Sequence, residues 1–229
     1  MNGHEVRVAN RPLRECNQAI RAGIESGQPV TVTDTRSRHN LGIGLPAGAE
    51  VHFEGSVGYY SASLLDGPEV TIDGNAGWAL GENLMSGKIR LTRDAGASVA
   101  ASMRGGEVFV GGDAGARAGI SMKGGTLLVG GDTGFLTGFM MQKGKIIVCG
   151  NAGDAVGDSM YEGVIYVGGE TGSLGNDAKT ETISEDELID IWGALEGYGL
   201  YGKPRFTKIV SSKKLYHFDS LERLEKAVV

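Results

Sequence analysis

The chain has 229 residues, a formal net charge of −6 and two cysteines. Its length allows one sizeable core, and its acidic balance excludes the basic surface with which proteins bind nucleic acid or anionic membranes nonspecifically. No stretch approaches the ~18 apolar residues of a membrane span, and Cys16 and Cys149 form no CxxC pair, so we expect a cytoplasmic protein with free thiols.

The first predicted element is a helix that begins near Pro12 and ends before Gly27. Its apolar stripe consists of Leu13, Cys16, Ile20 and Ile24. The segment 29–34, PVTVTD, follows as a predicted strand that leads into the next part of the chain. Residues 1–31 are therefore predicted to form an N-terminal cap of helix and strand.

A repeat with a period of 19 residues occupies the middle of the chain. Complete units begin at Ser56, Asn75, Asp94, Asp113, Asp132 and Asn151. The tenth place of each unit is Leu or Met, and the fifteenth and seventeenth places are aliphatic, as in Ile146 and Val148. A weaker preceding unit ends in Val51 and Phe53. Apolar residues two apart are typical of a short strand with one buried face, so each unit is predicted to contain one strand.

One strand per unit, a fixed period and glycine at the corners predict an all-β fold. We expect a right-handed parallel β-helix of about seven 19-residue turns over residues 32–177, with short helical caps at its ends. Equivalent side chains would stack in columns from coil to coil. The column of Leu and Met and the two aliphatic columns would then form a continuous interior.

Small residues mark two corners of every unit. The third place is glycine, and the seventh is glycine except at Ala62 and Ala100. The candidate corner glycines are Gly77, Gly81, Gly96, Gly115, Gly119, Gly134, Gly138, Gly153 and Gly157. Because glycine adopts positive φ and permits close backbone approach, we expect both places to let opposite walls of the coil nearly touch. The Asp or Asn that opens most units is suited to a turn. Its side chain can accept a hydrogen bond from a nearby amide, and its backbone tolerates the left-handed region.

A second helix is predicted after the repeats. Ser184 and Glu187 form a capping box at its start, and the segment 197–202 breaks it. Its apolar face consists of Leu188, Ile191 and Leu195. Another short helix is predicted after Ser220, so residues 178–229 form a C-terminal helical cap and tail. Caps are expected because the ends of a coil expose unpaired strand edges.

Motifs that carry chemistry are scarce. The two Gly-Lys pairs are followed by isoleucine, whereas a P-loop needs Ser or Thr there to ligate magnesium. The segment VGGDAG resembles the calcium-binding β-roll, but that motif repeats every nine residues, whereas this chain has one Asp or Asn per 19 residues at this place. The four histidines lie at no metal-ligand spacing, and no GxSxG occurs. We therefore predict no catalytic, cofactor-binding or metal-binding residue in this chain.

Two groups of residues leave alternatives open. Asp154, Asp158 and Glu162 form an acidic edge that is expected to be solvated, but an independent β-helix enzyme acting on a saccharide or acyl group would have to use them. The aromatic residues at the fourth place of three units are Tyr59, Trp78 and Phe135. They either pack in the core or point outward, and an outward row would be a docking surface.

The repeated GxxxG corners, the M-x-G-G step and the VGG-D/N-AG junction resemble the glycine-motif (GXGXG) β-helix domain at the C-terminal end of the large subunit of glutamate synthase. The resemblance covers roughly residues 32–177. Other features are more similar to the stand-alone small subunit of split glutamate synthase-like enzymes, such as N-methylglutamate synthase. They are the separate chain, the segment ISMKGG at 120–125, the run at 153–175 and the tail KKLYHF. A more distant similarity is to the scaffold chain of formylmethanofuran dehydrogenase that uses the same coil.

The resemblance implies a structural subunit of a hetero-oligomer. In such complexes one chain is a glutamine amidotransferase, and another carries FMN and an iron–sulfur cluster and reduces an imine derived from 2-oxoglutarate. The β-helix chain holds the two together without catalytic residues, and the corner glycines named above match the family's glycine places. Asn2 follows Met1, so the N-terminal nucleophilic cysteine of an amidotransferase is missing. We expect this chain to hold no cofactor and to have no activity alone.

Overall fold

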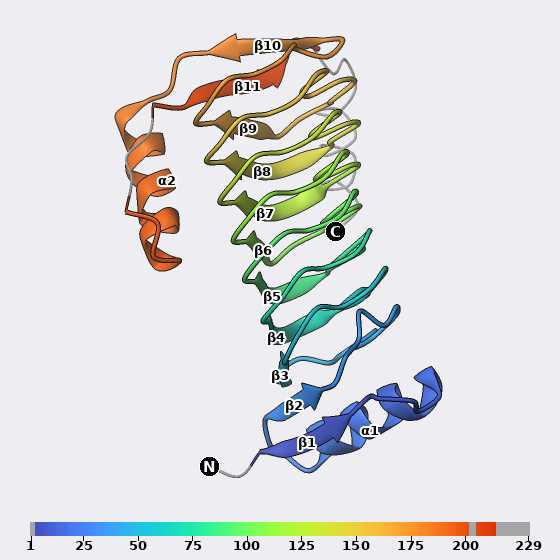
Figure 1. The fold of residues 1–229 in the computed structure, drawn as a ribbon. Helices are drawn as coiled ribbons and strands as arrows, with labels where there is room; N and C mark the ends of the chain where they lie inside the picture. Colours follow the sequence, from blue (N-terminus) through green and yellow to red (C-terminus); the bar gives the residue numbers. More distant parts are fainter. Residues whose placement is uncertain (1–2, 202–204, 214–229) are drawn as a thin grey trace, which may run out of the picture.

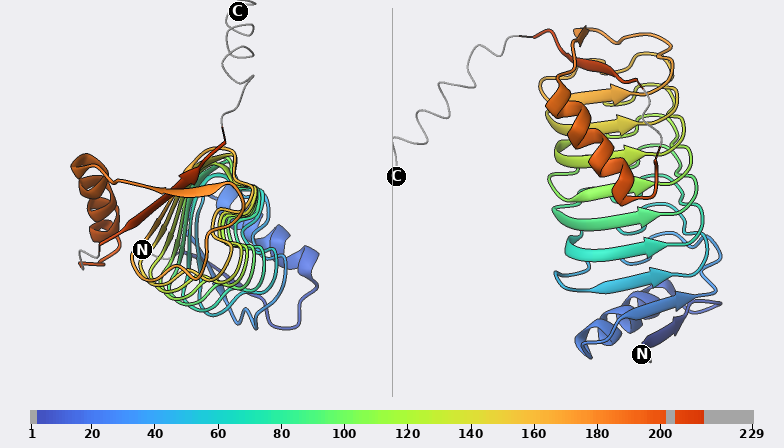
Figure 2. Two further views of the ribbon diagram at one scale, coloured as in Figure 1. Left: turned by 90° about the horizontal axis from the view of Figure 1, so that it is seen from above. Right: turned by 90° about the vertical axis from the view of Figure 1, so that its left-hand side faces the viewer.

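The computed structural model describes residues 3–201 and 205–213. The chain winds into a stack of similar coils, and each coil contributes one strand to a single long sheet (Figure 1). Viewed down the stack, the coils superpose on one another (Figure 2). This architecture confirms the predicted all-β parallel β-helix, with about seven regular turns and two helices among the described residues.

The strands of the coils pair in parallel and in a constant register. They are β2 (Val30–Thr33), β3 (Glu50–Phe53), β4 (Asp66–Ile72), β5 (Ser86–Leu91), β6 (Glu107–Val110), β7 (Lys123–Val129), β8 (Lys143–Val148) and β9 (Val164–Val167). Residues one repeat apart face each other, as Ile89 faces Val108. A second line of parallel bridges joins the second place of successive units, for example Ala95 to Ala114. Each coil is thus bonded to its neighbours on two sides.

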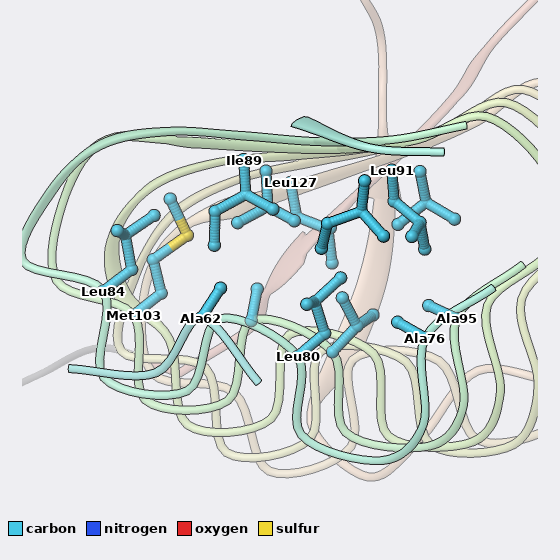
Figure 3. Packing of buried hydrophobic residues seen from close by; sticks show 14 of the residues in the cluster. Ala62, Ala76, Leu80, Leu84, Ile89, Leu91, Ala95, Met103 and Leu127 are labelled. Atoms are coloured by element: carbon cyan, nitrogen blue, oxygen red, sulfur yellow. The ribbon is translucent and has the colours of Figure 1, made fainter. Parts of the chain in front are cut away.

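Aliphatic side chains fill the interior. Met122, Leu127 and Val129 have no exposed surface, and the equivalent residues of the other units are likewise buried. In Figure 3, Leu91 on the strand side of the interior faces Leu80 on the opposite wall. Burying one such side chain contributes about 1.5–3 kcal/mol, so the columns of the repeat are the main source of stability.

The N-terminal end consists of β1 (His4–Arg7) and α1 (Leu13–Glu25). The predicted helix is confirmed, with Cys16 and Ile20 fully buried. The strand β1 was not predicted; it pairs in parallel with β2 and becomes the first strand of the sheet. The helix lies on the inward face of these two strands, because a Cβ atom on its Gly23 would lie 2.6 Å from the His4 ring.

The C-terminal end consists of β10 (Ala178–Glu181), α2 (Glu185–Gly197) and β11 (Thr207–Ser211). The capping box is confirmed: the Ser184 hydroxyl accepts from the Glu187 amide at 3.2 Å, and the Glu187 carboxylate accepts from the Ser184 amide at 2.9 Å. The strand β11 was not predicted; it runs antiparallel to β9 on one side and β10 on the other. The helix predicted after Ser220 lies outside the described residues.

The helix α2 lies along the outer face of the sheet beside β6–β9, rather than across the end of the stack (Figures 1 and 2). The sixteenth place of each unit points outward, and it is apolar in these four strands: Phe109, Leu128, Ile147 and Tyr166. Ile191 and Leu195 of α2 pack on this column. In the preceding strands the same place holds Thr71 and Arg90. The last coil's strand edge is therefore covered by β11, whereas α2 covers the side of the rod.

No helix among the described residues combines the length and the apolar character needed to cross a membrane.

Candidate functional site

The wall opposite the strands has an unusual backbone. The fifth, seventh and ninth places of each unit have positive φ, and the seventh place holds only glycine or alanine. Residues other than glycine with positive φ in this wall are Tyr60, Ala62, Leu64, Ala79, Asn83, Ser98, Ala100, Ser102, Arg117, Ser121, Leu136, Met140, Ala155 and Ser159. The sequence did not predict this conformation at the fifth and ninth places, because none of them holds glycine and several hold large residues such as Tyr60, Arg117 and Met140.

Hydrogen bonds between coils hold these strained residues. The amide of Met140 at a ninth place donates to the carbonyl of Asp158 in the next coil at 2.9 Å. The amide of Gly138 at a seventh place donates to the carbonyl of Ala118 in the preceding coil at 2.8 Å. A left-handed residue other than glycine costs roughly 1–3 kcal/mol, and the hydrogen bond of its amide to one neighbouring coil partly offsets that cost.

Glycine at the seventh place lets the two walls approach, as predicted. A Cβ atom on Gly119 would lie 2.5 Å from Cδ1 of Ile146, and the Gly119 φ is +69°. Ala62 and Ala100 adopt φ values of 50° and 56° at the equivalent place. The place therefore requires a left-handed backbone and a small side chain, and glycine meets both conditions at the lowest cost.

Glycine at the third place has a different reason, and the expectation that it faces the opposite wall is wrong. The third-place glycines of the complete units are Gly58, Gly77, Gly96, Gly115, Gly134 and Gly153, and none has positive φ. A Cβ atom on Gly115 would lie 2.8 Å from the backbone nitrogen of Ala97 in the preceding coil. These glycines thus allow successive coils to stack closely.

The residues that open the units form a hydrogen-bond ladder. The amide of Asp113 donates to Oδ1 of Asp94 at 2.9 Å, and the amide of Asp132 donates to Oδ1 of Asp113 at 2.8 Å. None of these residues has positive φ, so the predicted tolerance of the left-handed region is not used. Among the described residues, no group of three or more His, Cys, Asp or Glu is placed to hold a metal ion.

The candidate docking aromatics point outward, so the core-packing alternative is wrong for them. The exposed fractions of Tyr59, Trp78 and Phe135 are 42%, 58% and 49%. The Tyr59 ring stacks on His39 at 4.4 Å and on Trp78 at 5.5 Å between centroids. Phe135 lies three coils away from Trp78, and the intervening units hold alanine at the fourth place. We call the stacked rings of His39, Tyr59 and Trp78 the aromatic row.

More exposed apolar side chains belong to the same end of the repeat. Tyr60, Leu64 and Met85 are 48%, 57% and 47% exposed, and all three lie in the units that begin at Ser56 and Asn75. These residues occupy the fifth, ninth and eleventh places, and the following two units carry small or polar residues at all three places. Exposed apolar surface of this kind is typical of a contact with another macromolecule.

Two of the three candidate carboxylates hold the last coil together. Asp154 Oδ1 accepts from the Ser173 hydroxyl at 2.9 Å, and Asp158 Oδ2 accepts from the Asn176 amide at 3.0 Å. The Asn176 amide also holds the pKa of Asp158 below its usual range. Glu162 is half-buried just before β9. The acidic edge therefore includes side chains with a structural role.

The contacts that fix α2 were not predicted. Glu187 accepts from Lys208 Nζ at 2.7 Å and from the Tyr166 hydroxyl at 2.8 Å. Lys208, the Ser184 amide and Tyr166 together lower the pKa of Glu187 to about 2. At the other end of α2, the Tyr198 ring stacks on Phe109 at 4.0 Å.

A shallow pocket lies where the end of α2 meets the sheet. Its volume is about 350 Å³, and its charged lining residues are Glu69, Lys88, Arg90 and Glu107. Tyr198 donates to Glu107, and burial together with this carboxylate raises the pKa of Tyr198. The pocket combines both signs of charge in pairs, so its geometry selects no single ligand class.

Both cysteines are free, as predicted. Cys16 is buried on the inward side of α1, and Cys149 is half-buried beside α2. Burial raises the pKa of the Cys149 thiol to about 11, so the thiol stays protonated at neutral pH.

Comparison with known protein families gives a match that covers the repeats. The family model described as GXGXG motif matches residues 30–193, from the start of β2 into α2. A search of curated proteins returned no match.

Proposed function

Because this chain belongs to the GXGXG motif family, which is associated with glutamate synthase-type proteins, we propose that it is a non-catalytic structural subunit of a glutamate synthase-type complex. It docks a glutamine amidotransferase chain against a synthase chain that carries FMN and an iron–sulfur cluster. The complex is a glutamate synthase or an N-methylglutamate synthase. The family match over residues 30–193 is the observation that carries this proposal.

The construction of the coil supports a docking role. The interior columns are fully buried aliphatic side chains, and each coil is bonded to its neighbours on two sides. Such a stack is stiff, and it presents partners with a fixed outer surface rather than an inner chamber. The outer surface, including the aromatic row, is where we place the contacts with the partner chains.

Purification of this chain from its native cell extract tests the proposal. We expect a glutamine-hydrolysing chain and a flavin chain to copurify with it. A chain that emerges alone contradicts the proposal. Copurification with molybdenum or tungsten subunits would instead identify the formylmethanofuran dehydrogenase alternative.

Reconstitution from separate subunits tests the docking role itself. Leaving this chain out should lower glutamine-dependent amination of 2-oxoglutarate at least about tenfold, because nitrogen released by the amidotransferase then has to diffuse to the synthase chain. Amination supported by free ammonium or methylamine should fall much less, and the preferred amine distinguishes the two enzymes. Equal losses with glutamine and with the free amine would contradict the docking role.

A further inference from the structure

The sheet ends in a strand that pairs on one side only among the described residues. This strand, β1, stands at the end of the sheet order and pairs with β2. The amides of His4 and Val8 donate to the carbonyls of Pro29 and Thr33, each at 2.9 Å. The backbone N–H and C=O groups of successive residues in a strand point alternately to its two sides. Those of Val6 point to β2, like those of His4 and Val8, so those of the two residues in between point to the open edge. These residues are Glu5 and Arg7.

The two faces of β1 differ in a way that suits pairing. Val6 points inward and is 1% exposed, and α1 lies on this inward face. Glu5 and Arg7 point to the outer face and are exposed. At the other end of the sheet, β10 has no buried side chain, so pairing at that edge would extend no apolar layer.

We propose that β1 is an interface with a second copy of this chain, in which two β1 strands pair antiparallel about a two-fold axis at Val6. In this register Glu5 of each copy lies opposite Arg7 of the other, at positions where the backbone groups of both residues point to the partner strand. The inward-facing Val6 residues lie opposite each other. The proposal goes beyond the proposed function, because it concerns copies of this chain rather than partner chains.

Charge selects this register over its neighbours. A two-fold axis at Glu5 would place two carboxylates opposite each other, and an axis at Arg7 would place two guanidinium groups opposite each other. An axis at Val6 places opposite charges in both outer pairs. A register in which one β1 strand slides along the other by an odd number of residues is excluded, because it would place inward-facing side chains of one copy opposite outward-facing side chains of the other.

The present contacts of the two charged residues leave them available. Glu5 accepts from the Thr33 hydroxyl at 3.0 Å, and Arg7 Nε lies 3.3 Å from the Asp34 carboxylate with 69% of its side chain exposed. Exposed contacts of this kind are weak, so both side chains can turn to a partner strand. The paired segment is short, which fits a dimer that forms at micromolar concentrations.

Charge reversal followed by mixing tests the proposal with the full chain. Sedimentation velocity from about 1 to 200 μM should show a dimer for the wild type. Glu5→Arg and Arg7→Glu should each weaken the dimer at least about tenfold, because each creates two like-charge pairs. An equimolar mixture of the two variants should restore the dimer as a heterodimer, because each outer pair across the two copies then again joins an arginine to a glutamate.

Each alternative result overturns the proposal. A wild type that stays monomeric over this range leaves the edge to another partner or to none. Variants that dimerise like the wild type, or a mixture that stays monomeric, show that β1 does not pair in this register. The control is Lys179→Glu on the exposed strand β10, which should leave the dimer unchanged. Dissociation by that variant would place the interface at the other end.

Discussion

The carboxylate that opens one coil binds the amide that opens the next, and this contact repeats along the stack. Asp94, Asp113 and Asp132 stand one above the other, with Asn75 below them and Asn151 above. Stacked carboxylates repel one another, but each also fixes an amide at the start of a turn. The acceptor oxygen is what the turn needs, and asparagine supplies the same oxygen without the charge.

Asp113→Ala should lower the free energy of unfolding by about 0.5–1.5 kcal/mol, because the Asp132 amide loses its acceptor. Asp113→Asn should preserve stability or raise it slightly, because the acceptor stays and a repulsive charge goes. Urea unfolding measures both values. Equal losses in the two variants would show that charge, rather than the acceptor, matters at this place.

The two corner glycines of a unit should respond differently to alanine. Gly119→Ala places a methyl group near the flexible end of Ile146, in a left-handed conformation that Ala62 and Ala100 already adopt. Gly115→Ala places a methyl group against the backbone of Ala97, which cannot easily move aside because its carbonyl accepts from the Ala79 amide of the preceding coil. We expect a cost of about 1 kcal/mol at Gly119 and several kcal/mol at Gly115.

Gly119→Val should also cost several kcal/mol, through overpacking and backbone strain. Thermal unfolding of the three glycine variants measures these effects. If Gly115→Ala were the milder alanine substitution, the distinction between stacking and wall contact would be wrong.

At the scale of elements, the helix α2 depends on one carboxylate. Glu187 joins Lys208 of β11, Tyr166 of β9 and the first turn of α2. Its pKa in the folded chain, about 2, lies below the usual value of 4.5. The ionised form is therefore favoured by folding, and its contribution is present above pH 4.5 and is lost as the pH falls toward 2.

Glu187→Gln should lower stability at pH 7 by about 1 kcal/mol, a figure reduced for solvent screening of the partly exposed pair. The difference from the wild type should shrink as the pH falls from 4.5 toward 2. Urea unfolding at several pH values measures this trend. A difference that stays constant with pH would show that packing, rather than charge, links Glu187 to its partners.

Some elements were readable in the sequence and others were not. Apolar residues two apart revealed the strands of the coils, and the capping box revealed the start of α2. The strand β1 is too short for its alternation to stand out, and β11 enters the sheet between β9 and β10 by a pairing that no repeat encodes. The sequence does contain a signal for the position of α2. The outward-pointing sixteenth place changes from Arg90 to Phe109 in the first strand that the helix covers.

The candidate surface was predicted only in part. Spacing identified Tyr59, Trp78 and Phe135 as one column, but whether the fourth place points inward depends on the left-handed residue that follows it. That conformation is imposed by hydrogen bonds between coils, and Tyr60, Arg117 and Leu136 share it without sharing any property of their side chains. Local sequence therefore could not decide the direction of the rings.

For the whole molecule, the aromatic row provides the sharpest test of docking. Tyr59→Ser together with Trp78→Ser should weaken binding of a partner chain by at least about 2 kcal/mol, or roughly thirtyfold, if the row is a contact. Both side chains are exposed, so the melting temperature should change little. The matched control is Ile189→Ser, an exposed apolar residue on α2. Titration calorimetry with each partner chain measures the affinity, and an unchanged affinity for both partners would remove the row from the docking surface.

The constant repeat length determines how the molecule can lengthen or shorten. Removal of residues 113–131 would join Gly112 to Asp132, and the amide of Asp132 would meet the carboxylate of Asp94 in place of that of Asp113. Every other ladder would close in the same way, and the two ends would approach by the spacing of one strand, ~4.8 Å. The rod can therefore lengthen or shorten only by whole coils, and the separation that it sets between two attached chains changes only by the height of a coil.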